Sequence, residues 1–280
     1  MVRPPNLFII GAPRCGTTSL YSAFKQHPQI YTSVLKEPHF YAQDMPIQPH
    51  TVTSVDEYSH LFYCAKDEKY VAEASVWYLY SKSAASLISK EHPEARIVIM
   101  LRNPVEMIVS LYNLYLRTGN ETQTDPRLAL LRNNEEVHKH SYFPFGLYYK
   151  RLIKLYDTLE TWFSYFKREQ INILFYEEFY HHPNKSFTQL CNWLNIDDDA
   201  DISFDPVEAR KRVKFKAMRQ LRHLPTSIKE KINPAASKLH AQKKHKTISE
   251  DVMEILRRES TERSRNLPAI IGRDLPLSWT

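Results

Sequence analysis

The chain has few cysteines and no long apolar run. Its three cysteines, Cys15, Cys64 and Cys191, are odd in number and widely spaced, which argues against a disulfide framework and against a cysteine-based zinc site. No stretch approaches the roughly 18 consecutive apolar residues of a membrane span. The first residues also lack the charged, apolar and small-residue regions of a secretory signal. We therefore expect a protein of the reducing cytoplasm without a membrane span.

Acidic and basic residues are both frequent, but the basic residues are in excess. Of the 280 residues, 42% are hydrophobic and 25% are charged, and the formal net charge is +6. The hydrophobic fraction is large enough for a sizeable core, and the charged fraction is that of an ordinary globular protein. A basic chain favours anionic partners, which leaves nucleic acid, a membrane surface and a polyphosphorylated small ligand open.

Short apolar runs alternate with segments of helical spacing. Strands are expected at 7–10, 30–32, 70–74, 96–101 and 171–176, and helices at 18–26, 81–92, 104–117, 148–165 and 183–194. This alternation predicts an α/β fold with a mostly parallel sheet and helices on both faces. The polar stretch 119–134 is expected to be a loop. From about residue 205 the chain becomes basic and helical, and we expect one domain over 1–280.

Glycine is scarce, and two of the five glycines flank one turn. Gly11 and Gly16 lie five residues apart between the first strand and the first helix. Glycines at such a turn let a ligand approach the backbone, and the amides at a helix N-terminus attract anions. Hydroxyls follow at Thr17, Thr18 and Ser19. The loop therefore predicts a phosphate site.

The lysine of an ATPase loop is missing. The pattern G-x-x-x-x-G-K-[ST] would place it at the position of Thr17, whereas the positive charge appears earlier, at Arg14. The next long apolar strand ends at Arg102 instead of an acidic residue that could hold magnesium. These departures argue against ordinary ATP chemistry, although an atypical small-molecule kinase stays an alternative.

The loop resembles the 5′-phosphosulfate loop of sulfotransferases that use 3′-phosphoadenosine 5′-phosphosulfate (PAPS). The resemblance implies a P-loop NTPase-like sulfotransferase fold, PAPS as donor, adenosine 3′,5′-bisphosphate (PAP) as product, and no required metal. Arg14 stands where many relatives have lysine, and Cys15 departs from the family at a small-residue position. We expect Cys15 to be a spacer in preference to an activated thiol. The implied donor contacts are Pro13, Arg14, Cys15, Gly16, Thr17, Thr18 and Ser19.

A second motif resembles the 3′-phosphate site of the same family. Arg102 follows an apolar strand, and Ser110 lies about two helical turns further on. Arginine makes paired charge-assisted bonds to phosphate, so both residues are implied PAPS contacts. The family match also suggests Tyr176 beside the adenine and, more weakly, Lys211 and Arg212 over the 3′-phosphate.

Candidates for the catalytic base lie in the segment Lys36-Glu-Pro-His-Phe-Tyr41, which resembles glycan sulfotransferases of the heparan sulfate type. The resemblance implies Glu37 as base, because an acceptor hydroxyl must lose its proton as it attacks sulfur. His39 is a further catalytic candidate. Lys36 and Glu73 are candidate acceptor contacts, and Glu73 is the second candidate base.

The acceptor is less well defined than the donor. We expect sulfation of a hydroxyl, or with less support an amine, on a small metabolite or natural product, with a glycan or lipid-linked sugar as the alternative. A basic nucleic-acid-binding protein is the alternative from another class, but the chain has no recognised nucleic-acid motif, so no nucleic-acid partner is expected. The sequence does not define an oligomeric state.

Overall fold

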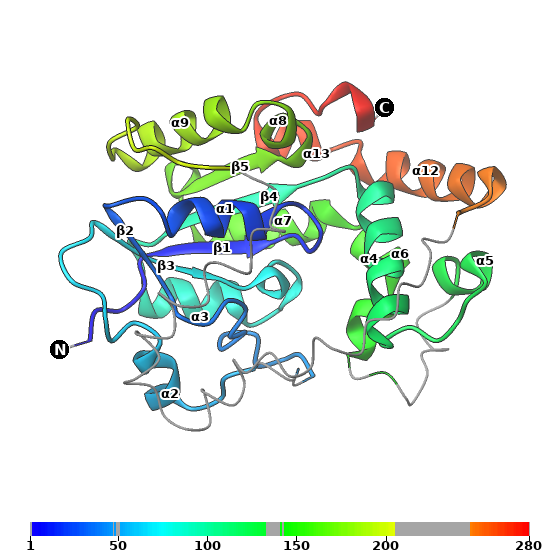
Figure 1. Ribbon diagram of the computed structural model, residues 1–280. Helices are drawn as coiled ribbons and strands as arrows, with labels where there is room; N and C mark the ends of the chain where they lie inside the picture. The colour runs from blue at the N-terminus through cyan, green and yellow to red at the C-terminus, as the bar shows by residue number, and fades with distance from the viewer. Residues whose placement is uncertain are drawn as a thin grey trace.

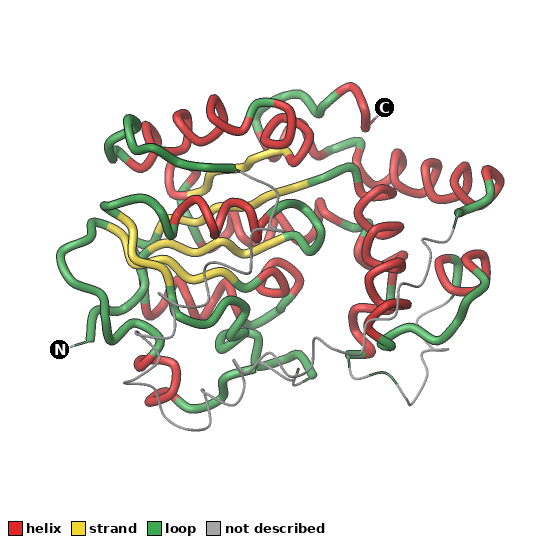
Figure 2. The backbone as a smooth tube through the Cα atoms, viewed as in Figure 1, coloured by secondary structure: helices red, strands yellow, loops and turns green. Residues whose placement is uncertain are grey.

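The computed structural model describes residues 2–46, 48, 51–132, 141, 143–204 and 247–279. Its centre is a five-stranded sheet in the order β2-β3-β1-β4-β5, and every neighbouring pair is parallel (Figures 1 and 2). The strands are β1 (Leu7–Gly11), β2 (Ile30–Thr32), β3 (Tyr70–Ala74), β4 (Arg96–Leu101) and β5 (Ile171–Phe175). The expected α/β class and parallel sheet are confirmed.

Helices cover both faces of the sheet. On one face, Phe24 of α1 (Thr17–Phe24) packs against Phe187 of α9 (Pro183–Leu194), with ring centroids 6.1 Å apart. On the other face, α3 (Ala84–Glu91) packs against α7 (Leu155–Tyr165). This two-sided arrangement places the carboxyl ends of β1, β3 and β4 along one edge, where α/β proteins bind ligands.

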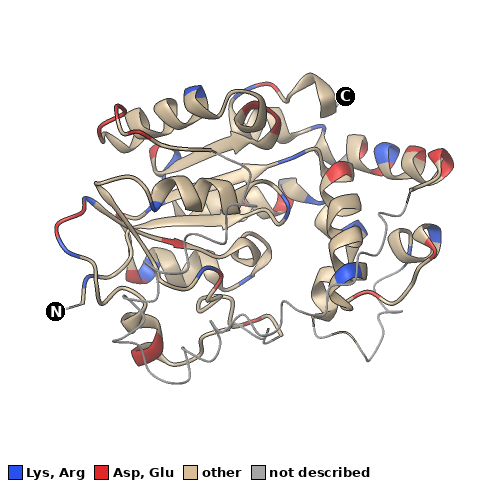
Figure 3. Cartoon of the chain, viewed as in Figure 1, with Lys and Arg blue, Asp and Glu red and all other residues tan. Residues whose placement is uncertain are grey.

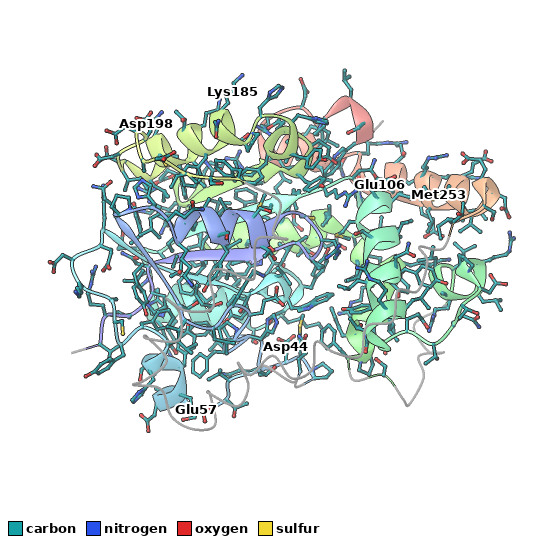
Figure 4. All side chains as sticks on the ribbon, viewed as in Figure 1. Asp44, Glu57, Glu106, Lys185, Asp198 and Met253 are labelled. Carbon is teal, nitrogen blue, oxygen red and sulfur yellow. The ribbon has the colours of Figure 1, made fainter. Side chains whose placement is uncertain are left out.

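Further helices border this edge. The long helix α4 (Pro104–Thr118) packs against α12 (Glu250–Ser264). Figure 4 shows Glu106 of α4 beside Met253 of α12. The shorter helices are α2 (Val55–His60), α5 (Pro126–Leu130), α6 (Tyr149–Leu152), α8 (Tyr176–His181) and α13 (Leu267–Ile271), with 3-10 turns η1 (Val76–Tyr80), η3 (Pro144–Leu147), η4 (Arg168–Gln170) and η8 (Leu277–Trp279).

Local sequence explains the sharp start and end of α4. Asn103 caps the helix, since its side-chain oxygen accepts hydrogen bonds from the amides of Val105 and Glu106. Pro104 occupies the first turn, where its missing N–H costs nothing. Gly119 ends the helix in the left-handed region with φ 79°.

Most of the expected elements differ by a few residues at their ends, and three differences have a clear local cause. The predicted helix 148–165 is divided into α6 and α7, because the chain turns at Ile153 and Lys154. The predicted strand 171–176 ends at Phe175, and Tyr176 begins α8, whose acidic first turn suits a helix N-terminus. The predicted loop 119–134 contains α5, which Asp125 caps.

The described strands are nearly free of charge. Figure 3 shows them mainly in tan, and the charged exceptions are Glu73 in β3 and Arg96 at the start of β4. Arg96 is partly exposed, whereas Glu73 is fully buried beside the apolar core. No helix in the described part of the chain combines the length and apolarity required to cross a bilayer.

Candidate functional site

The loop between β1 and α1 has the backbone geometry of a phosphate cradle. Gly16 precedes α1 with φ 86°, a conformation that side chains rarely adopt. A Cβ at this position would approach the Tyr176 ring at 3.2 Å and the Met100 methyl at 3.3 Å. The Ser19 amide donates to the Gly16 carbonyl oxygen at 2.9 Å, so the amides at the very start of α1, those of Thr17 and Thr18, are the ones available to an anion.

Arg14 joins the loop to the second predicted phosphate motif. Its Nε donates a hydrogen bond to Ser110 Oγ of α4 at 3.0 Å. Desolvation, and then the positive charges of Arg117 and Arg102, lower the pKa of Arg14. A guanidinium still remains charged at neutral pH. The structure thus brings together two motifs that are about 90 residues apart in the sequence, and it concentrates positive charge between them.

Arg102 and Tyr176 form the next part of the site. The Arg102 guanidinium lies over the Tyr176 ring, 4.5 Å from its centroid, and its Nη2 is 3.4 Å from Glu106 Oε2. Tyr176 also packs beside Gly16. The predicted donor contacts from β1, β4 and β5 therefore meet at one edge of the sheet. Lys211 and Arg212 lie outside the described residues.

Support for this edge comes from residues that the sequence interpretation missed. The Glu177 carboxylate accepts hydrogen bonds from the Asn103 amide at 2.9 Å and from the Trp279 indole at 3.2 Å. Asn103 Nδ2 donates to the Ser278 carbonyl oxygen at 2.7 Å. These contacts hold the residue next to Arg102 in place. The sequence Asn-Pro before a helix signalled the cap, but no local pattern signalled the partners at 177 and 278.

Cys15 is enclosed within this loop. It is fully buried, and its Sγ lies 3.4 Å from the Pro13 carbonyl oxygen. Burial raises the pKa of the thiol far above its usual value. These features favour the expected spacer over an activated, low-pKa thiol, because loss of water outweighs the favourable charges of Arg102 and Arg14.

Glu37 and His39 form a strained pair beyond the end of β3. Both have positive φ, 64° and 52°, which is uncommon for residues other than glycine and costs conformational energy. The Glu37 amide donates to the Ala74 carbonyl oxygen at 2.8 Å, and the His39 amide donates to Ser75 Oγ at 3.0 Å. These bonds anchor the segment beside β3, the strand next to β1.

The carboxylate of Glu37 lies between two basic side chains. Lys36 Nζ forms an ion pair with Oε1, and His39 Nε2 is 3.8 Å from Oε2. Burial raises the pKa of Glu37, but the charges and hydrogen bonds of Lys36 and His39 outweigh it, and the net pKa is well below the usual value. The Glu37 side chain is 35% exposed, whereas that of His39 is 3% exposed.

Glu73 lies behind this segment in a different environment. Its Oε2 accepts hydrogen bonds from the hydroxyls of Tyr58 at 3.0 Å and Tyr78 at 2.8 Å. Its Oε1 is buried and has no hydrogen-bond partner among the described residues. Burial raises the pKa of Glu73 to about 7, although the bonds from Ser75, Tyr78 and Tyr58 oppose the shift. The two candidate bases therefore differ: Glu37 is partly exposed and has a lowered pKa, whereas Glu73 is fully buried and has a raised pKa.

Comparisons with known proteins agree with this geometry. The crystal structure of a sulfotransferase from Alicyclobacillus acidocaldarius superposes with a TM-score of 0.75 and 27% identity, covering 99% of each chain. The structure of mouse sulfotransferase SULT7A1 complexed with PAP has a TM-score of 0.56 at 17% identity, covering 96% of this chain and 86% of that one. At that identity the second likeness is evidence for the fold alone.

Curated relatives are similar over parts of their length. Carbohydrate sulfotransferase 15 of Mus musculus is 28% identical over 43% of this chain and 29% of its own. Bifunctional heparan sulfate N-deacetylase/N-sulfotransferase 1 of Caenorhabditis briggsae is 24% identical over 72% of this chain and 24% of its own. The chain thus matches less than a third of these longer relatives. The model of the sulfotransferase domain matches residues 4–266, and the chain belongs to this family.

Proposed function

We propose that this protein transfers a sulfuryl group from PAPS to a hydroxyl group of an acceptor and releases PAP. The observation that carries the proposal is the contact between Arg14 and Ser110, which joins two phosphate motifs at one sheet edge. Two separate anion sites suit a nucleotide with phosphates at both the 3′ and the 5′ positions. The absence of the ATPase lysine in the loop is consistent with the same donor.

PAPS, when bound, supplies an activated sulfuryl group attached to the 5′-phosphate. Arg14 and the first amides of α1 would hold that end and stabilise negative charge on the leaving phosphate oxygen. Arg102 and Ser110 would hold the 3′-phosphate, and Tyr176 would border the base. Pro13, Cys15 and the hydroxyls of residues 17–19 complete the loop around the phosphate.

Glu37 is the proposed base. A new bond forms between the acceptor oxygen and sulfur while the bond from sulfur to the phosphate oxygen breaks, and the acceptor proton moves to Glu37. Its partial exposure, 35% against 0% for Glu73, gives an acceptor access to the carboxylate. Lys36 and His39 keep Glu37 ionised and orient it. Because Glu73 is buried beneath Tyr58 and Tyr78, we assign it a positioning role.

Two acceptor classes follow from different observations. The small-molecule acceptor expected from the sequence stays a prediction. The names of the matched relatives, a carbohydrate sulfotransferase and a heparan sulfate N-sulfotransferase, favour a sugar hydroxyl or amine as the second candidate. The segment 36–41 supports the same class, since it resembles that of glycan sulfotransferases.

Calorimetric titration with PAP, with ATP and magnesium, and with a short oligonucleotide tests the donor. We expect PAP to bind more tightly than ATP with magnesium or the oligonucleotide. Binding of ATP alone would contradict the proposal. Transfer of labelled sulfate from PAPS to a panel of saccharides and small hydroxyl compounds then tests the reaction and identifies the acceptor class.

The Glu37→Gln variant tests the base. We expect PAP affinity to be unchanged and turnover to fall by about 100- to 10,000-fold, the usual contribution of general base catalysis. Glu94→Gln, which alters an exposed carboxylate remote from the segment, is the matched control. Near-normal turnover in Glu37→Gln would assign the proton transfer to another group.

A further inference from the structure

A basic cavity lies outside the proposed nucleotide site. It has a volume of about 460 Å³ and is bordered by the end of η1 with the two residues after it, by Arg132 just beyond α5, by helix α6 and by α7 with its cap residue. Its charged lining residues are Lys82, Arg132, Lys150, Arg151, Lys154 and Asp157. Neither the phosphate loop 11–19 nor Arg102 nor Ser110 lines it. Lys150 is ion-paired with Glu259 at 3.1 Å and Arg132 with Glu121, so the excess of positive charge in the lining comes from Lys82, Arg151 and Lys154 against Asp157.

Arg132 provides the most specific observation. Its side chain is 4% exposed, and Nη2 forms an ion pair with the buried carboxylate of Glu121. Its Nε donates to the Ala129 carbonyl oxygen at 2.9 Å. Nη1 is buried without a hydrogen-bond partner among the described residues. Arg132 lines the cavity, and a buried cationic donor of this side chain that has no acceptor in the described part of the chain makes it a candidate to bind an anion.

The surrounding structure holds this guanidinium in place. Glu121 Oε1 accepts hydrogen bonds from the amides of Thr122 at 2.9 Å and Gln123 at 2.8 Å, and Oε2 lies 3.4 Å from the Tyr149 hydroxyl. The carboxylate that orients Arg132 is therefore itself fixed by three further donors. Such preorganisation is typical of a binding group, because little ordering remains to be done when a ligand arrives.

The other charged residues support the same ligand. Lys82 and Lys154 are exposed, and Lys154 is the N-terminal cap residue of the 11-residue helix α7, whose positive dipole end favours anions. Asp44, labelled in Figure 4, accepts a hydrogen bond from the Lys82 amide at 2.9 Å and so orders this turn. Asp157 is the acidic residue of the lining and is exposed to solvent, and Glu259 lies 3.1 Å from Lys150.

The cavity shares a wall with the phosphate loop. Leu79 lines the cavity and lies against Gly11, where an added Cβ would meet the Leu79 Cβ at 2.6 Å. We propose that this cavity is a second anion-binding site, which binds a carboxylate, sulfate or phosphate group through Arg132 Nη1 with Lys82 and Lys154. The group comes either from a free inorganic anion or from an acceptor that carries a negative charge.

Binding of inorganic sulfate at saturating PAP tests the site, because PAP fills the nucleotide phosphate positions. Sulfate is titrated against chloride at constant ionic strength, with thermal shift and calorimetry as readouts. In the Lys82→Ala/Lys154→Ala variant we expect sulfate affinity to fall about 5- to 10-fold while PAP affinity is unchanged. Lys66→Ala/Lys185→Ala removes two exposed lysines elsewhere and is the matched control (Figure 4 labels Lys185). Equal sulfate binding by both variants would overturn the proposal.

Arg132→Lys gives a second, sharper test. A lysine ammonium can still pair with Glu121, so folding is expected to survive, but lysine lacks the second amino group, Nη1, that has no partner among the described residues. We expect sulfate affinity to fall about tenfold or more with an unchanged unfolding midpoint. Unchanged sulfate affinity in a folded Arg132→Lys variant would remove Arg132 from the site and contradict the proposal.

A comparison of saccharides identifies the source of the anion. A uronate-containing hexasaccharide and the neutral chitohexaose are titrated into the wild type and both variants. Tighter binding of the uronate oligomer than of sulfate, lost in the variants, assigns the site to the acceptor. Sulfate binding without uronate binding assigns it to a free anion. Neither result requires turnover, so the anion site is tested separately from the proposed sulfuryl transfer.

Discussion

Arg14 in the β1–α1 loop donates a hydrogen bond from Nε to Ser110 Oγ in α4, at 3.0 Å. The two residues come from the two phosphate motifs, and Arg14 has a positive φ of 63°. The contact brings the implied 5′ and 3′ ends of the nucleotide site together. A mutation at one motif should therefore affect how the other motif binds the nucleotide.

Arg14→Ala and Ser110→Ala should each weaken PAP binding. A charge-assisted hydrogen bond contributes about 1.5–3 kcal/mol, so we expect Arg14→Ala to lower the affinity about 10- to 100-fold and Ser110→Ala to have a smaller effect. Because the side chains touch, the double variant should lose less than the sum of the two losses. Calorimetry measures all three. The exposed Arg258→Ala in α12 is the control, and strict additivity would show that the two motifs bind independently.

The phosphate loop and the Arg102 motif were predictable because each is local. A strand, a glycine turn and a helix follow one another within about twenty residues, and the apolar run 96–101 ends directly at Arg102. The structure confirms these elements and brings the two motifs together. The order of the strands in the sheet could not be predicted, because hydrophobic periodicity does not show which strands are neighbours. The alternation of strands and helices did predict that they pair in parallel.

The parts that escaped prediction depend on contacts between distant segments. Glu177, just after β5, accepts a hydrogen bond from the amide of Asn103, just after β4. Glu121, before α5, forms an ion pair with Arg132, which follows that helix. The break between α6 and α7 occurs within a segment of continuous helical spacing. The burial of Cys15, which favours the expected spacer over the activated thiol, could not be predicted either, because the distance of a side chain from water cannot be obtained from its neighbours in sequence.

Gly16→Ala tests the geometry of the loop. The residue has φ 86°, and an added Cβ would meet the Tyr176 ring at 3.2 Å. Gly119→Ala is a matched control, because Gly119 has φ 79° but no heavy atom within 4 Å of the added Cβ. Both substitutions should cost about 1–2 kcal/mol of folding free energy through left-handed strain.

The two glycine variants should differ in PAP binding. Gly16→Ala moves Tyr176 or the loop, so its PAP affinity should fall, whereas that of Gly119→Ala should stay at the wild-type value. Urea unfolding measures the shared strain, and calorimetry measures the difference in binding. Equal PAP affinity in both variants would show that the loop does not contact the nucleotide at Gly16.

Cys15 should resist alkylation in the folded protein. It is buried and its thiol pKa is raised, whereas Cys64 is partly exposed. With iodoacetamide at pH 8, we expect Cys64 to react first and Cys15 to react only at the rate of unfolding. Peptide mass spectrometry assigns the labelled residue, and Cys64→Ser provides the control. Fast labelling of Cys15 that PAP blocks would identify an accessible thiol in the site.

Glu73 should make folding stability depend on pH. Burial raises its pKa to about 7 in the folded state, above the usual value of about 4.3 in an unfolded chain. The folded state therefore binds the proton more tightly, and stability decreases as pH rises between these two values. A shift of this size corresponds to about 4 kcal/mol, which is fully present only below the unfolded pKa and is lost as pH rises to about 7.

Glu73→Gln isolates this contribution, because the amide keeps an oxygen for Tyr58 and Tyr78 but does not titrate. Urea unfolding from pH 4.5 to pH 8 measures the free energy of unfolding of both proteins. Relative to the variant, the free energy of unfolding of the wild type should fall by up to about 3 kcal/mol between pH 4.5 and pH 8. The exposed Glu94→Gln should follow the wild type. If the difference in unfolding free energy between wild type and Glu73→Gln did not change with pH, Glu73 would be ionised throughout this range. Its buried Oε1 would then require a cationic partner such as Lys36.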